Sequence, residues 1–130
     1  MPLKNKVLVI GNTKDSEKVF KHLETENLVF YLTDKPVTLT NFNGIKIEGN
    51  LKDLSFLEEN GIKSTSKVFI STNDDELNIF LTLASVKLYK IKNVITILND
   101  EELSPLIDTL PGVKVISNVN DVLGGNLWNF

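Results

Sequence analysis

The sequence contains no cysteine and no arginine. Without cysteine the chain forms no disulfide and offers no thiolate as a nucleophile or metal ligand. All 14 basic residues are lysines, so the planar guanidinium fork that binds phosphate through two parallel hydrogen bonds is missing. An anion site in this chain would therefore depend on backbone amides or on lysine.

Long apolar runs are also absent, and none approaches the roughly 20 residues that cross a bilayer. The start MPLKNKVLVIGN lacks the apolar core and cleavage site of a signal peptide. A formal charge of −3 gives no footprint for nucleic acid or a membrane surface. We expect a cytoplasmic protein that reaches the membrane, if at all, through a partner and does not insert directly.

Short β-rich runs alternate with helical patterns along the chain, which predicts a parallel sheet. Several runs are almost wholly apolar, as in strands covered by helices on both faces. We therefore predict an α/β, Rossmann-like, doubly wound parallel sheet of about six strands with helices on both faces. The six runs are Lys6–Ile10, Leu28–Thr33, Ile45–Ile47, Lys67–Ser71, Val94–Leu98 and Val113–Ile116.

The intervening segments predict amphipathic helices, with two exceptions. Residues 74–89 are apolar on most sides, which exceeds the need of one packing face and predicts a subunit interface. Residues 35–43 combine Pro36 with two threonines and two asparagines, which favours a loop. We predict a domain over residues 1–118 and a C-terminal tail over residues 119–130, which ends in Trp128 and Phe130 and is docked, swapped or disordered.

The first strand runs into Gly11 and a helix follows closely, which is where a dinucleotide fold places pyrophosphate on backbone amides. The pattern G-x-G-x-x-G would require glycine also at positions 13 and 16, where the chain has Thr13 and Ser16. Asp15 adds a negative charge nearby. Two interpretations stay open: a phosphate-binding loop, or a helix simply capped by Asn12 or Thr13.

The second strand ends at Asp34, 23 positions after Gly11, near the spacing at which an acid accepts hydrogen bonds from adenosine ribose. Lys35 follows and could meet a phosphate. The alternative is an ordinary turn, since Asp-Lys-Pro is also a turn sequence.

Two acidic stretches are explained by helix capping. In STNDDELN we expect Asn73 to cap a helix, with Glu76 in the reciprocal position. In NDEEL we expect Asn99 and Glu102 to do the same. We therefore predict no metal site, although Asp74, Asp75 and Glu76 could be interpreted as one, and no catalytic residue, since the single histidine, His22, has no triad partners.

Four segments together, KVLVIGN, VFYLTDKP, IEGNLKDLSFLEENGIKSTSKVFISTNDDELNIF and NVITILNDEE, resemble the N-terminal domain of the RCK family. These domains regulate potassium conductance and also occur in Trk and Ktr uptake systems. The resemblance covers about residues 6–117 and implies a non-catalytic domain that binds NAD(H), ATP, ADP or AMP at the carboxyl ends of its strands. It also implies a homo-oligomer, formed here through residues 74–89 and the tail, that regulates a membrane potassium channel or transporter subunit.

Position by position, the resemblance assigns eleven residues to the nucleotide. The phosphates would meet Gly11, Asn12, Thr13 and Lys14; the ribose Asp34 and Lys35; the adenine Asn50 and Leu51; and the sugar-phosphate side Ser71, Thr72 and Asn73. The chain departs from the family at Thr13 and Ser16, at Asn50, where an acid is usual, and at Ile97, where many relatives have arginine. These departures leave an alternative open, a degenerate Rossmann module that binds no nucleotide and acts through self-association.

Overall fold

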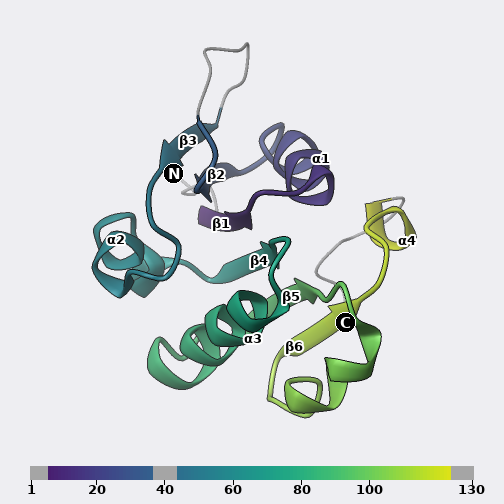
Figure 1. Ribbon diagram of the computed structural model, residues 1–130. Coiled ribbons are helices and arrows are strands. Elements are labelled where there is room, and N and C mark those ends of the chain that lie inside the picture. The colour runs from purple at the N-terminus through teal and green to yellow at the C-terminus, as the bar shows by residue number, and fades with distance from the viewer. Residues whose placement is uncertain (1–5, 37–43, 124–130) are drawn as a thin grey trace.

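One parallel sheet of six strands, in the order β3-β2-β1-β4-β5-β6, forms the centre of the computed structural model, which describes residues 6–36 and 44–123 (Figure 1). This confirms the predicted α/β Rossmann-like fold. The strands are β1 (Lys6–Gly11), β2 (Leu28–Thr33), β3 (Ile45–Glu48), β4 (Lys67–Ser71), β5 (Asn93–Ile97) and β6 (Val113–Ile116). The order reverses between β1 and β4, where folds of this kind have their ligand crevice.

The helices lie on both faces of the sheet (Figure 1). Helix α1 (Lys14–Leu23) and the short α4 (Asn120–Leu123) cover one face, and α2 (Leu54–Glu59) and α3 (Asp75–Leu83) cover the other. A π-helical turn, η2 (Ala84–Leu88), continues α3. Two 3₁₀ segments, η1 (Ile62–Ser64) and η3 (Glu101–Leu106), precede β4 and β6.

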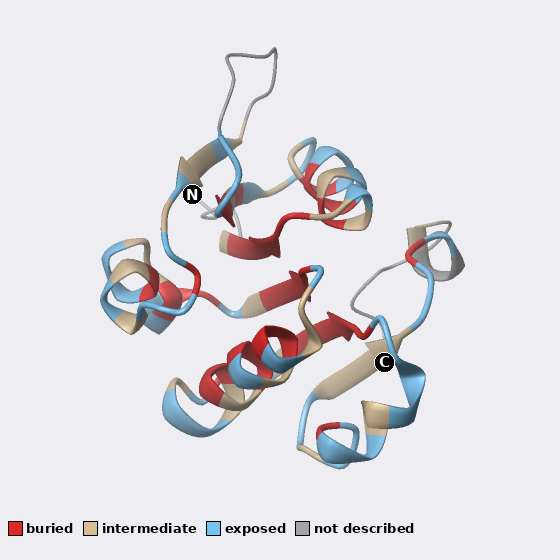
Figure 2. Ribbon diagram, viewed as in Figure 1, coloured by how far each residue is buried: buried red, intermediate tan, exposed pale blue. Residues whose placement is uncertain are grey.

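Each face of the central strands buries its own apolar cluster. Val7 and Val9 of β1 pack with Val19 and Phe20 of α1, whereas Leu8 and Ile10 point to the α2 and α3 side. This two-sided burial explains why β1 is a continuous apolar run rather than an alternating one. Figure 2 shows the same gradient, with buried central strands and a half-buried β6 at one edge.

The apolar character of residues 74–89 has a specific cause in the structure. Three polar residues, Asn78, Thr82 and Ser85, occupy the fully buried face of this helix. Their hydrogen bonds are internal: the Thr82 hydroxyl pairs with Thr96 at 2.6 Å, and that of Ser85 donates to the Leu81 carbonyl. Leu77 and Leu81 are buried as well, while Phe80 is 39% and Leu88 54% exposed.

Two of the predicted caps are wrong by one residue. The N-cap of α3 is Asp74, whose carboxylate accepts from the amides of Glu76 and Leu77, and not Asn73. The N-cap of η3 is Asp100 and not Asn99. In each pair the preceding asparagine is engaged elsewhere, since Asn73 bonds with Asn12 and Asn99 with Asp75.

Only residues 119–123 of the predicted tail lie within the described part of the chain. Val119 is fully buried in the cluster beneath α1, and Leu123 of α4 packs against that cluster. Residues 124–130 and most of the predicted loop, residues 37–43, lie outside the described part of the chain. Among the described residues, no helix is long and apolar enough to cross a bilayer.

Candidate functional site

The loop after β1 is closed on itself by the two residues that replace glycines. Thr13 is the N-cap of α1: its hydroxyl accepts from the Ser16 amide at 3.1 Å, and the Ser16 hydroxyl accepts from the Thr13 amide at 3.0 Å. This reciprocal capping box confirms the interpretation that Thr13 caps the helix. It also occupies helix N-terminal amides that a phosphate would otherwise bind.

Ser16 is tied in addition to the protein core. Its side chain is fully buried, and its hydroxyl pairs at 2.7 Å with the hydroxyl of Tyr31, which is 1% exposed. Burial raises the pKa of Tyr31 to about 12. Glycine at position 16 would leave this phenol without its Ser16 partner, so the serine and the tyrosine form a matched pair.

Gly11, the one glycine that remains of the pattern, is explained by packing. A Cβ at this position would collide with the Ser71 carbonyl of β4 and with the Ser16 side chain. Its neighbour Asn12 donates its backbone amide to the same Ser71 carbonyl at 3.2 Å. Gly11 therefore lets β1 and α1 approach β4, with or without a nucleotide.

The Asn12 side chain joins the carboxyl ends of three strands. Its amide nitrogen donates to Asp34 at 3.1 Å, at the end of β2, and lies 3.5 Å from the Asn73 side-chain oxygen. Its oxygen accepts from the Asn73 backbone amide at 2.9 Å, after β4. Asn12 is only 7% exposed, and these bonds form where the strand order reverses between β1 and β4.

The loop after β4 is also internally bonded. Ser71 pairs with the Thr13 hydroxyl at 2.7 Å, and the Thr72 amide donates to the Asn78 side chain at 2.8 Å. Ser71 and Thr72 are 2% and 1% exposed, respectively. The structure thus brings Asn12, Thr13, Asp34, Ser71 and Asn73 into one network, as expected for neighbouring strand ends.

The other predicted site residues lie outside this network. Lys14, Lys35 and Asn50 are exposed, and the Asn50 side chain accepts from the Lys52 amide at 2.9 Å. Leu51 is 1% exposed and packs in the core beneath α2 and α3, so its side chain offers no surface to an adenine ring. A pocket of about 300 Å³ lies close by, lined by Lys52, Asp74, Glu76, Leu77 and Phe80.

Asp75 is a further organising residue at this edge. Its carboxylate accepts from the backbone amides of Asn99 and Asp100, both at 2.8 Å, and so ties α3 to the loop after β5. Burial raises its pKa, but these amides and the side chains of Asn78 and Asn99 outweigh burial and hold the pKa below the ordinary value. Among the described residues, no group of histidine, aspartate and glutamate side chains is arranged to hold a metal ion.

Negative charge dominates the loops and first helical turns at the carboxyl ends of the strands. The carboxylates there outnumber the lysines Lys14, Lys35 and Lys52, and a polyphosphate would be repelled by this excess. These carboxylates are Asp15, Glu17, Asp34, Asp53, Asp74, Asp75, Glu76, Asp100, Glu101 and Glu102.

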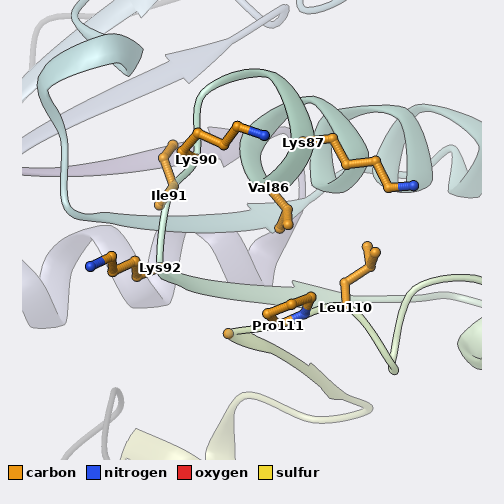
Figure 3. Close-up of a pocket in the computed structure, with 8 residues that line it drawn as sticks. Val86, Lys87, Lys90, Ile91, Lys92, Leu110 and Pro111 are labelled. Carbon is orange, nitrogen blue, oxygen red and sulfur yellow. The ribbon is translucent and has the colours of Figure 1, made fainter.

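A larger pocket, of about 430 Å³, lies at the opposite end of the strands, next to the segments that precede β5 and β6 (Figure 3). Val86, Ile91, Leu110 and Pro111 form its apolar wall, and its lysines point in different directions instead of converging on one point. It is separate from the predicted nucleotide crevice, which lies at the carboxyl ends of the strands.

This sheet order, with loops converging where the order reverses, defines an α/β domain of the Rossmann-like class. A sequence model of the TrkA-N domain matches residues 7–118, and the chain therefore belongs to the TrkA-N domain family. None of the curated proteins compared with the chain matches it.

Solved structures support the same fold. The GsuK channel bound to NAD is 24% identical with a TM-score of 0.75 over 97% of this chain. The GsuK RCK domain is 23% identical with a TM-score of 0.73 over 98%. GsuK bound to ADP is 24% identical with a TM-score of 0.70 over 95%. The chain spans only 24%, 28% and 34% of these three chains, respectively.

The bridge made by Asn12 and the roles of Tyr31 and Asp75 were not predicted from the sequence. An asparagine next to Gly11 and a tyrosine in a β-strand are ordinary residues in a linear pattern. The only available signal was the joint presence of Thr13 and Ser16, three positions apart, which is a capping spacing.

Proposed function

We propose that this chain is a regulatory, non-catalytic domain of a potassium transport system whose crevice between the ends of β1, β2 and β4 binds NAD(H) or an adenine nucleotide. The observation that carries the proposal is the convergence of Asn12, Asp34 and Asn73 where the strand order reverses. Asp34 would receive the ribose hydroxyls, and Asn73 would offer its amide to a ligand oxygen. Membership of the TrkA-N family and the likeness to GsuK support the regulatory role.

The negative charge at the carboxyl ends of the strands favours ligands with few phosphate groups. The carboxylates around the crevice and the lack of arginine disfavour a triphosphate. The self-capped loop at Thr13 and Ser16 further reduces the amides available to phosphate. We therefore expect NAD(H) or AMP to bind more tightly than ATP.

In the biological setting that we propose, residues 1–118 are the regulatory domain and residues 119–130 a segment that docks on it or on a second copy. The domain is cytoplasmic and homo-oligomeric and is held at the membrane by a potassium channel or transporter subunit. No metal takes part. Within the predicted interface segment, Phe80 and Leu88 are exposed on α3 and η2 and are available for contact between copies.

Isothermal titration with NADH, NAD, AMP, ADP and ATP tests the proposal directly. We expect saturable binding that weakens at least tenfold in Asp34→Asn, because one charge-assisted ribose contact is lost. Asp108→Asn is the matched control, since its carboxylate accepts from Ser104 away from the crevice. No heat and no thermal shift with any of the five ligands at millimolar concentration would refute nucleotide binding.

A second candidate function is a module that binds no nucleotide and acts only through self-association. The closed capping box of Thr13 and Ser16 is the observation that favours it. Light scattering of the native chain and of Phe80→Ser distinguishes this case. A monomer at every concentration would count against it, whereas an oligomer that Phe80→Ser dissociates, in a protein without nucleotide affinity, would favour it.

A further inference from the structure

We propose that Asn12 is an internal stand-in for the ligand, which competes with nucleotide for Asp34 and for the Asn73 amide and so sets the affinity of the crevice. This inference rests on the proposed nucleotide-binding function and names the residue that controls it. Asn12 stands at the first unspecified position of the G-x-G-x-x-G pattern, directly after Gly11.

The chemistry of the two partners fixes how the Asn12 amide lies. An ionised carboxylate only accepts hydrogen bonds, so the amide nitrogen must face Asp34; a backbone N–H only donates, so the amide oxygen must face Asn73. The contacts of 3.1 Å and 2.9 Å agree with that orientation. One side chain thus supplies a donor to the carboxylate and an acceptor to the amide.

A bound nucleotide would present the same pair of groups. A ribose hydroxyl donates to the acid at the end of the second strand, and a sugar or phosphate oxygen accepts from loop amides. Asn12 therefore satisfies in the free protein the two groups that ligand binding requires. Asp34 is exposed, so a ligand can approach its carboxylate, but Asn12 already bonds its Oδ1 and the Asn73 amide, and a ligand that uses these same two atoms must displace the Asn12 side chain.

The rest of the crevice makes this competition effective. Thr13 and Ser16 bond each other, and Ser71 is bonded to Thr13. These neighbouring polar groups therefore do not compete with Asn12 for Asp34 and the Asn73 amide. The ligand-free state is consequently stabilised by these hydrogen bonds. A nucleotide that uses Asp34 Oδ1 and the Asn73 amide binds by exchanging its own contacts for those of Asn12.

Asn12→Ala, studied by isothermal titration with NADH and AMP, tests the inference. We expect the affinity to rise roughly tenfold or more, because the competing charge-assisted bond is gone. Asn60→Ala is the matched control: it also removes a side-chain amide bond, to the Phe56 carbonyl, but at the other edge of the sheet, and its affinity should equal that of the native chain.

Hydrogen exchange at the Asn73 amide supplies a second readout that needs no ligand. This amide should be protected in the native chain, lose protection in Asn12→Ala, and regain it when NADH or AMP is added. Exchange that is equally fast in both proteins would overturn the inference, since the bond to Asn12 would then not form.

The outcomes separate this inference from the proposed function. If the native chain binds nucleotide as tightly as Asn12→Ala or more tightly, Asn12 positions Asp34 rather than competing for it; the inference fails and the proposed function stands. If neither protein binds any nucleotide, the proposed function and the inference fail together. Higher affinity in Asn12→Ala, with the exchange pattern above, supports both.

Discussion

The pairing of Ser16 with Tyr31 leads to a quantitative prediction about restoring glycine to the loop. Ser16→Gly removes half of the capping box, about 1 kcal/mol, and adds the cost of glycine in a helix, up to about 1 kcal/mol. It also removes the Tyr31 partner that lies at 2.7 Å, and because the Thr33 side chain still bonds this hydroxyl, the cost is about 1 kcal/mol. We expect Ser16→Gly to lower the free energy of unfolding by about 3 kcal/mol.

A double-mutant cycle with Tyr31→Phe isolates the hydroxyl pair. In the Tyr31→Phe background there is no phenol to lose its Ser16 partner, so Ser16→Gly should cost about 1 kcal/mol less than in the native background. Urea unfolding of the four proteins measures this coupling. Tyr89→Phe serves as the control because the Tyr89 hydroxyl donates to Glu58 in an exposed position, away from Ser16. Coupling below about 0.3 kcal/mol would refute the matched pair.

Three further predictions concern titration and packing. Burial raises the pKa of Tyr31 and of Tyr89 to about 12, so the folded protein should show tyrosinate absorbance only near pH 12, against about pH 10 for the protein unfolded in urea. The stability that the neutral phenols contribute should be lost as the pH rises across that interval. A titration midpoint near pH 10 in the folded protein would contradict this prediction. The lowered pKa of Asp75 stabilises the fold above pH 3.8, and this contribution is lost as the pH falls through the pKa of Asp75 in the folded protein. The free energy of unfolding, measured with urea from about pH 2 to about pH 7, should therefore depend less on pH in Asp75→Asn than in the native chain. An unchanged pH profile would argue against this role. Gly11→Ala should lower the free energy of unfolding by about 2 kcal/mol or more, because the new Cβ meets the rigid Ser71 carbonyl. Gly49→Ala should cost less, because its Cβ meets the Phe56 ring, which can move. Equal losses of stability in thermal unfolding would refute this packing account.

The architecture could be predicted because it depends on patterns that are local in the sequence. The runs at Leu28–Thr33, Lys67–Ser71 and Val113–Ile116 match β2, β4 and β6 without any shift of boundary. Gly61 has a φ of +92°, in the left-handed region, and follows α2 at the position where glycine ordinarily ends a helix. Continuous apolar runs and glycines at helix ends can be recognised in the sequence without knowledge of tertiary contacts.

The site could be predicted only in outline, because its bonds join residues far apart in the chain. Asn12 and Asn73 are 61 positions apart, and nothing at either position indicates the other. The one-residue error at the α3 cap has the same origin. Asn73 and Asp74 are both good capping residues, and the contact of Asn73 with Asn12 leaves Asp74 to cap.

The loss of glycines after β1 differs physically from simple decay of a binding loop. Decay would be expected to leave buried polar atoms without partners, at a cost of about 1 to 3 kcal/mol each. Instead, Thr13, Ser16 and Tyr31 satisfy one another, and Asn12 satisfies Asp34 and Asn73. These hydrogen bonds stabilise the ligand-free form, and a ligand that uses the same atoms must replace them. Gly11 does not indicate a nucleotide by itself, since the collision with Ser71 already requires glycine there; the affinity of Asn12→Ala is therefore more informative than the glycine pattern.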